Sequence, residues 1–256
     1  MKIAVILRMV PDLVEELPLL DGQVAWDEVM LTLNEFDDHA LEEAVLLKEE
    51  TGAEVVALAL SAGGDRVLRT AIARGADRAV QVVADGTEGA SARSIAPLFA
   101  EAVRAEQADL VLTGVQAPGD LFGGLVPFLA AALGWPAADG VTSLSLSAGR
   151  VRVVQECGAG RMTLLLVTPP AAFGVQAARQ PPRYVSGSRL RQVARTAAIT
   201  SITPAAGLAD EPARLLALSP PRKARSVTFV GDDPDAAAAE ILMALRARGM
   251  TGRQDG

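Results

Sequence analysis

The chain contains a glycine-rich loop between an apolar strand pattern and an apolar helix pattern. Its glycines are Gly114, Gly119, Gly123 and Gly124. Residues 110–113 precede the loop as an apolar run, and residues 125–133 follow it with helical spacing. Glycines let a backbone approach a ligand, and a helix start offers free N–H groups and positive dipole, so this order can hold a phosphate. An ordinary strand-to-helix connection would have the same pattern, because a glycine loop without a full motif is weak evidence.

Other kinds of site are poorly supported by the residues present. Cys157 is the only cysteine and His39 the only histidine, which excludes an internal disulfide framework and disfavours His-cluster metal sites and Ser-His triads. No residue is a convincing general base or nucleophile, so we expect neither a metal site nor substrate chemistry in this chain. The net charge of −7 argues against nucleic acid and anionic membranes as partners.

The elements that would position the loop follow a regular alternation. Apolar runs at 3–7, 54–60, 79–83 and 109–113 are typical of buried strands, and helical patterns cover 37–50, 65–73, 91–106 and about 121–133. This alternation predicts an α/β fold, a doubly wound and mostly parallel sheet with helices on both faces. Ligands of such sheets bind beyond the carboxyl ends of the strands, where strand order reverses.

The second half of the chain has a different pattern. Short runs at 141–147, 151–156 and 162–167 predict a hairpin or small meander that completes the sheet. From about residue 180 the chain is rich in proline and arginine and reads as irregular, with a strand pattern at 226–230 and a helix pattern at 234–248 after Asp233 as a cap. We therefore expect a nucleotide-binding domain over 1–180 and an extended arm with a terminal helix over 181–256.

Composition agrees with a single large domain or a domain with an extension. The chain has 256 residues, of which 50% are hydrophobic and only 4% aromatic, so Ala, Val and Leu must build the core. The apolar start is too short for a secretory signal, and no run reaches the roughly 18 apolar residues of a membrane span. We expect a soluble, cytoplasmic protein without membrane insertion.

Four segments together resemble the beta subunit of electron-transferring flavoproteins, most closely the branch that serves methylamine and N-methylglycine dehydrogenases. The segments are Lys2 to Asp12, Leu33 to Glu49 with LNEFDD at its start, Ala73 to Ala79 (ARGADRA), and Gly114-Val-Gln-Ala117 running to Leu133-Gly-Trp-Pro136, with Pro182-Arg-Tyr184 downstream. The resemblance extends over nearly the whole chain, including the arm and final helix.

This resemblance implies a carrier of electrons. The family's beta subunit pairs with a larger alpha subunit, which holds most of the FAD, receives electrons from flavoprotein dehydrogenases, and passes them to a quinone reductase or similar acceptor. The beta subunit buries an AMP, and in the electron-bifurcating branch a second FAD takes that place. The resemblance also implies that the arm embraces the alpha subunit, whereas the residues alone leave open whether the arm folds back.

The resemblance also implies which residues bind the nucleotide. They are Ile6, Asn34, Glu35, Phe36, Asp37, Ala62, Gly114, Val115, Gln116, Ala117, Asp120, Gly123, Gly124 and Leu125. Each has a plainer alternative: Ile6 can be core, Asn34 a helix cap, Asp37 a first-turn carboxylate, and Asp120 a solvated loop residue, which we favour.

The loop and the docking segment depart from the family pattern. The family loop carries an acidic triplet followed by Gln-Thr-Gly, where this chain has Gly119-Asp-Leu121 and Gly124-Leu-Val126, so backbone N–H groups would have to bind the phosphate. The family's docking loop for dehydrogenases corresponds here to Tyr184, Val185, Gly187, Leu190 and Arg191, with Gly187 in place of an exposed leucine. Cys157 reads as a small apolar filler.

Two alternatives to the carrier subunit remain. A stand-alone adenine-nucleotide-binding regulatory module would use the same fold, but it needs no embracing arm. A bifurcating subunit with its own FAD would need an open, acidic loop of small residues, and Leu121, Phe122 and Leu125 are bulky.

Overall fold

The computed structural model describes every residue except 13, 15, 119, 121–122, 210–229 and 251–256. The chain divides into two compact units, Met1–Ala217 and Leu218–Gly256. The first unit contains the sheet and the candidate site.

The first unit is built on one sheet whose described part has nine strands. In spatial order these are β11 (Met162–Val167), β10 (Arg150–Glu156), β9 (Ala137–Ser147), β12 (Ala171–Val175), β8 (Leu110–Gly114), β1 (Lys2–Ile6), β6 (Glu54–Leu60), β7 (Arg78–Val82) and β13 (Thr200–Ile202). The strands from β9 to β13 in this order pair in parallel, and β10 pairs antiparallel with both β9 and β11. The predicted mostly parallel sheet and the predicted meander at its edge are therefore confirmed.

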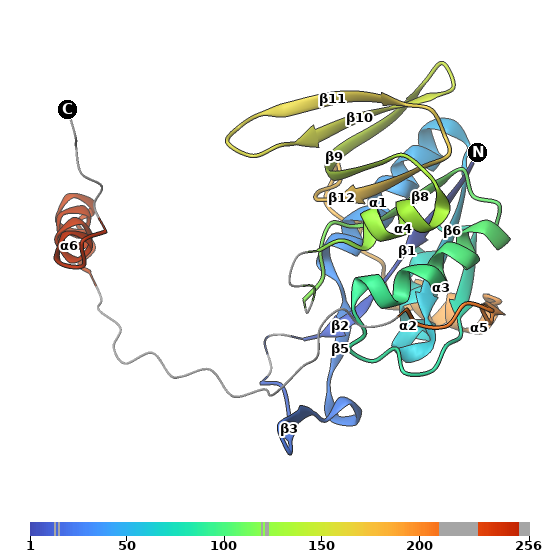
Figure 1. Ribbon diagram of the computed structural model, residues 1–256, viewed down its shortest axis with the longest axis horizontal. Helices are drawn as coiled ribbons and strands as arrows, with labels where there is room; N and C mark the ends of the chain where they lie inside the picture. Colours follow the sequence, from blue (N-terminus) through green and yellow to red (C-terminus); the bar gives the residue numbers. More distant parts are fainter. Residues whose placement is uncertain (13, 15, 119, 121–122, 210–229, 251–256) are drawn as a thin grey trace. The chain divides into compact units, whose positions relative to one another are not determined.

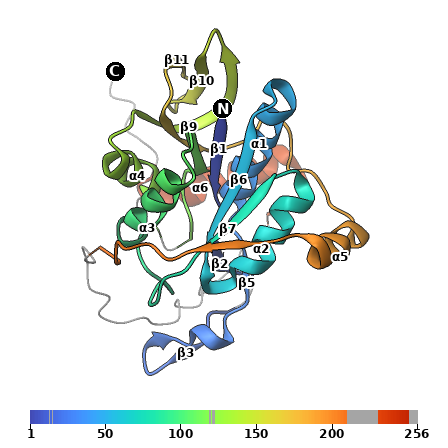
Figure 2. The ribbon, with the colours of Figure 1, turned by 90° about the vertical axis from the view of Figure 1, so that its right-hand side faces the viewer.

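Helices cover both faces of this sheet (Figures 1 and 2). The helices α1 (Glu35–Thr51) and α2 (Ser61–Arg74) pack on one face, and α3 (Ala92–Ala105) and α4 (Leu125–Leu133) pack on the other. Successive residues of β1 alternate between the two cores, with Val5 on the α1 side and Ile6 on the α3 side. Because both faces of the strand are buried, its sequence is a continuous apolar run.

Three segments are more ordered than their sequence patterns indicated. No strand or helix was predicted between residues 7 and 37. This stretch contains a small ribbon of β2 (Met9–Pro11) and β5 (Leu31–Leu33), a hairpin of β3 (Leu19–Leu20) and β4 (Gln23–Val24), and the 3-10 helix η1 (Trp26–Glu28). β12 was not predicted from its pattern. The stretch after residue 180, expected to be irregular, includes α5 (Gly187–Thr196) and the sheet strand β13.

The second unit contains α6 (Pro234–Ala247) among its described residues. The Asp233 side chain accepts a hydrogen bond from the backbone N–H of Asp235, which confirms it as the cap of this helix. The strand predicted at 226–230 lies almost entirely outside the described residues. Within the described ranges, no helix is long and apolar enough to cross a membrane, and no cluster of three or more potential metal ligands occurs.

Candidate functional site

The order of the strands places a ligand-binding edge beside β1. From β1 the chain continues to β6 and β7 on one side of the sheet, and then returns to β8 on the other side of β1. Strand order therefore reverses between β1 and β8, and the crevice beyond their carboxyl ends is where open α/β sheets bind ligands. Arg8 lies just after β1, and Gly114 is the last residue of β8.

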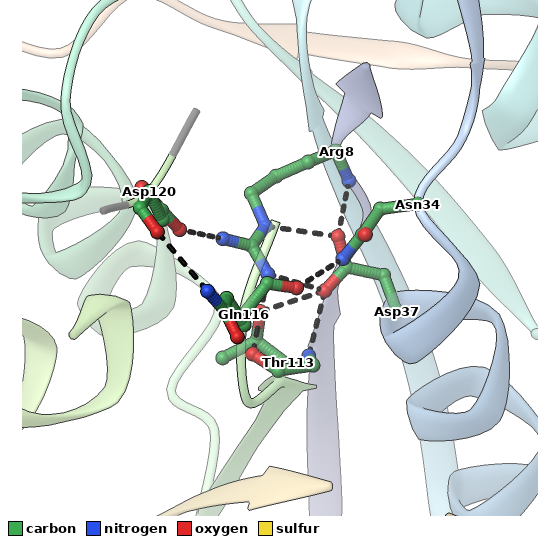
Figure 3. A network of polar contacts seen from close by, with 7 residues as sticks. Arg8, Asn34, Asp37, Thr113, Gln116 and Asp120 are labelled. Atoms are coloured by element: carbon green, nitrogen blue, oxygen red, sulfur yellow. Dashed lines mark hydrogen bonds and ion pairs between the residues drawn. The ribbon is translucent and has the colours of Figure 1, made fainter. Parts of the chain in front are cut away.

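A buried ion pair occupies this edge (Figure 3). Arg8 is 7% exposed and Asp37, in the first turn of α1, is fully buried. The Arg8 backbone N–H and Nε both donate to Asp37 Oδ2 at 2.9 Å, and Arg8 Nη2 donates to Oδ1 at 2.9 Å. Oδ1 also accepts from the N–H of Gly114 at 2.6 Å and from Thr113 Oγ1 at 3.1 Å. A forked, charge-assisted pair of this kind fixes the first turn of α1 to the ends of β1 and β8.

The glycine-rich loop joins the same network. Arg8 Nη1 donates to Asp120 Oδ2 at 2.8 Å, and the Gln116 side chain donates to the Asp120 backbone carbonyl at 3.2 Å. The Asn34 side chain donates to the Gln116 carbonyl at 2.9 Å (Figure 3). The expectation that Asp120 is a solvated loop residue was therefore wrong, because its side chain is only 10% exposed and paired with Arg8.

The charges in this network do not balance, since one guanidinium faces two carboxylates. Burial lowers the pKa of Arg8, but the carboxylates of Asp37 and Asp120 outweigh burial, and the net shift is upward. Burial raises the pKa of Asp120 above its ordinary value, and the charge of Arg8 offsets this only in part. The Arg8 guanidinium therefore stays charged, and it pairs with the carboxylates of Asp37 and Asp120.

The glycines before α4 bring backbone N–H groups to this edge. Gly123 and Gly124 have φ of 67° and 108°, values that favour glycine, and a Cβ on Gly123 would lie 2.9 Å from the Val115 carbonyl oxygen. No described side chain caps α4, and Pro127 in its first turn has no N–H. The N–H groups of Leu125 and Val126 at the helix start are therefore available to an anion.

Helix capping differs between the helices around this edge and the others. The described starts of α1, α2 and α4 have no side-chain cap, although Asn34 stands at the cap position of α1 and its amide is diverted to Gln116. In contrast, α3, α5 and α6 are capped by Ser91, Ser186 and Asp233. Among the described α-helices, the three without a cap are those that begin beside β1, β6 and β8, where a phosphate can satisfy the free N–H groups.

Most of the predicted nucleotide-binding residues meet at this edge. A Cβ on Gly114 would lie 2.4 Å from the Phe36 Cβ, so α1 can approach β8 only because residue 114 is glycine. Ile6 is fully buried in the core, which matches its plainer alternative, and Glu35 is exposed. Ala62 lies in the first turn of α2.

The remaining predicted residues belong to the loop. Ala117 is buried, and its carbonyl accepts from the N–H of Asp120 at 3.0 Å. The N–H of Val115 donates to the Val175 carbonyl at 3.2 Å, which ties the loop start to β12. Arg8 had no predicted role, although a charged residue directly after five buried ones at a strand end was a usable signal.

The predicted docking residues lie on a separate surface, around the start of α5. Tyr184 is 90% exposed, Arg191 is exposed, and Gly187 is the first residue of α5. Helix α5 packs on α2, where Arg69 Nη1 donates to the Ala194 carbonyl at 3.0 Å. Val185 and Leu190 are half-buried.

The segment that leads to α5 is fastened to α1 by two arginines. Arg179 Nε donates to Glu43 Oε1 at 2.9 Å, and Arg183 Nη2 donates to Glu42 Oε1 at 2.8 Å. Each guanidinium also pairs with a second glutamate two turns further along α1. The segment before the predicted docking residues is therefore held in place by charge-assisted pairs.

Cys157 lies outside both surfaces. It is exposed, and its Sγ lies 3.2 Å from Thr163 Oγ1, so the interpretation as an apolar filler was wrong.

Comparison with known proteins defines the class to which this fold and site belong. Residues 22–206 match the family model described as the electron transfer flavoprotein domain. The chain is 31% identical to the electron transfer flavoprotein subunit beta of Methylophilus methylotrophus over 264 residues, which cover 97% of this chain and 100% of that protein. It is 29% identical to the subunit beta of Syntrophomonas wolfei, with 94% of each chain covered, and 27% identical to that of Mycobacterium bovis, with 72% of each covered.

The chain therefore belongs to the electron transfer flavoprotein family, and within it to the beta subunits.

Proposed function

We propose that this chain is the beta subunit of a cytoplasmic, heterodimeric electron transfer flavoprotein and holds an AMP at the edge between β1 and β8. FAD, bound mainly by the alpha subunit, supplies the redox chemistry. The heterodimer carries electrons from flavoprotein dehydrogenases to a quinone reductase or similar acceptor. This chain binds the AMP, pairs with the alpha subunit and docks the dehydrogenase, and it has no substrate chemistry of its own.

The capping pattern is the observation that carries the AMP site. The helices α1, α2 and α4, which begin near the carboxyl ends of β1, β6 and β8, have no side-chain cap in the described structure, whereas α3, α5 and α6 are capped. Helix starts with free N–H groups and positive dipole ends attract phosphate. The residues present therefore fit a nucleotide whose phosphate is held by the N–H groups of Leu125 and Val126, with Gly123 and Gly124 allowing the approach.

Exposed apolar side chains support an alpha subunit as partner. On β11, Met162, Leu164 and Leu166 are each 55% exposed, and they alternate along the strand with Leu165 and Val167, which pack on the core. In the second unit, Ile241 and Met243 of α6 are more than half exposed. We assign residues 181–256 to an arm that embraces the alpha subunit, with Tyr184 to Arg191 docking dehydrogenases.

The experiment is mass spectrometry of the nucleotides released when the chain, co-purified with its candidate alpha subunit, is denatured. We expect one FAD and one AMP per heterodimer. Two FAD per heterodimer would show that a second flavin binds in place of AMP, and FAD alone would refute the AMP site. Failure to form a complex would favour the stand-alone module.

A glycine pair provides a matched control for the site. Gly123→Ala strains a φ of 67° and places a methyl group 2.9 Å from the Val115 carbonyl oxygen, whereas Gly149→Ala strains a φ of 75° with nothing within 4 Å. We expect the Gly123 variant to lose AMP and the Gly149 variant to retain it. Equal AMP content in both variants would place the nucleotide elsewhere.

A further inference from the structure

A cavity of about 290 Å³ lies on the α1–α2 face of the sheet, between the β2–β5 ribbon and α2. We call it the α2 cavity. Its apolar lining comes from Met9, Leu31, Leu33 and Val67. None of its lining residues belongs to the nucleotide site predicted above, and the Arg8 network does not contribute to it.

The charged lining of the α2 cavity carries an excess of positive charge. Arg66 and Arg74 line it from α2, and Asp38 lines it from α1. Arg74 Nη1 pairs with Asp38 Oδ1, which neutralises one guanidinium. The Arg66 guanidinium has no hydrogen bond or ion pair with any described residue, so the cavity has one uncompensated cation.

Arg74 also has a donor without a partner among the described residues, and this atom lies below the surface and is not itself open to the cavity. Its Nε is buried and is the one buried side-chain nitrogen or oxygen in the described structure without a hydrogen-bond partner. A buried donor left unsatisfied is costly, and such groups in folded proteins usually have a hydrogen-bond partner. Burial, followed by the nearby charge of Arg183, lowers the pKa of Arg74, which is the direction that a bound anion would reverse.

Size and lining together define what the α2 cavity can hold. At about 290 Å³ it is at the lower end of ligand pockets, which span roughly 300–1,000 Å³, so a dinucleotide is excluded and a small molecule fits. Its two arginines can bind one anionic head, because a guanidinium matches carboxylate and phosphate geometry. Its leucines, valine and methionine can cover an apolar body.

We propose that the α2 cavity is a binding site for a small amphipathic anion, with a single carboxylate or phosphate head on Arg66 and Arg74 and a short apolar body against Met9, Leu31, Leu33 and Val67. The site is separate from the proposed AMP site. It does not depend on that proposal, because none of its lining residues is among the predicted nucleotide-binding residues.

Calorimetric titration of the full-length chain with hexanoate tests the proposal, with 1-hexanol and inorganic phosphate as half-probes. Hexanoate has both the head and the body, whereas each half-probe has only one. We expect hexanoate to bind and both half-probes to bind at least about tenfold more weakly, because each lacks one kind of contact. Hexyl phosphate then identifies the head, and tighter binding of either hexanoate or hexyl phosphate agrees with the proposal.

Charge-matched variants locate the binding. Arg66→Gln removes the unpaired cation without breaking an ion pair, so it should fold normally and weaken hexanoate binding about tenfold. Arg93→Gln makes the same charge change on α3, across the sheet, and should leave binding unchanged. Excess AMP should not compete with hexanoate.

Three results would overturn the proposal: no hexanoate binding to the unmodified chain, equal binding to the Arg66 and Arg93 variants, or 1-hexanol binding as tightly as hexanoate. Competition by AMP would show that the two sites are one. Neither an absence of bound AMP nor a missing alpha subunit affects these readouts, so failure of the AMP proposal is distinguishable from failure of this one.

Discussion

The substitution Asp37→Asn tests whether the buried ion pair stabilises the edge of the sheet between β1 and β8. Asp37 is fully buried and accepts five hydrogen bonds: three from Arg8, one from the N–H of Gly114 and one from Thr113 Oγ1. An asparagine oxygen can still accept from Gly114 and Thr113. The asparagine NH2 group would then face the backbone N–H and Nε of Arg8, so hydrogen-bond donors would oppose one another at a buried position.

The magnitude follows from this geometry. Breaking one side of a buried, hydrogen-bonded ion pair typically costs about 3–5 kcal/mol, because the remaining charge stays buried with too few partners. Asp120 still pairs with Arg8 Nη1, which favours the lower end of that range. We therefore expect Asp37→Asn to lower the free energy of unfolding by about 3 kcal/mol, measured by urea denaturation and circular dichroism.

A surface pair serves as the control. Asp65 pairs with Arg69 one turn along α2, and its side chain is 63% exposed. Exposed ion pairs are screened by water and salt, so Asp65→Asn should leave the urea midpoint nearly unchanged. If Asp37→Asn were as mild as Asp65→Asn, the Arg8 network would have no structural role.

Two further perturbations address the docking segment. Burial is the main cause that raises the pKa of Glu43 above its ordinary value of 4.5, so its contribution to stability is fully present below about pH 4.5 and is lost as the pH rises through the folded pKa. The unfolding free energy of the unmodified chain minus that of Glu43→Gln should therefore decrease as the pH rises above 4.5, and a constant difference from pH 4 to 7 would contradict this. A Cβ at Gly187 would meet only the end of the Arg191 side chain, at 3.4 Å, so Gly187→Leu should fold normally. In a stopped-flow assay, it should speed electron transfer about tenfold from dehydrogenases that bind an exposed leucine of the docking loop. An unchanged rate would mean that docking uses other residues.

Some elements could be predicted because their local pattern matches their burial. Residues 3–7 are a continuous apolar run, and the corresponding strand β1 is buried on both faces. The periodic spacing over 37–50 correctly predicted α1. β12 could not be found in this way, because Ala171 to Val175 (AAFGV) combine alanines and a glycine with one phenylalanine and one valine and show no strand-like pattern. Pairing with β8 and β9 buries them.

The Arg8 network was beyond prediction for a different reason. Asp37 and Asp120 lie 29 and 112 positions after Arg8 along the chain, so no local sequence pattern indicates that the three residues meet. The order of the strands brings them together, because β1 and β8 are neighbours only after the chain has passed through β6 and β7. The same residues individually match common surface patterns, a first-turn carboxylate and a loop aspartate.

The network also gives a physical reason for the departures in the glycine-rich loop. Residues 124–126 carry no side-chain hydroxyl or amide donor, so this part of the loop gains little order from a phosphate through its side chains. Asp120 instead ties this loop to Arg8, and the Gln116 and Asn34 side chains tie it to itself and to the start of α1. Because one guanidinium already faces two carboxylates, a phosphate in the proposed site meets no free side-chain cation in the described network and depends on the N–H groups at helix starts. The loop of this chain is therefore preorganised by an internal ion pair, so its affinity for AMP should depend on backbone geometry at Gly123 and Gly124 more than on any side chain.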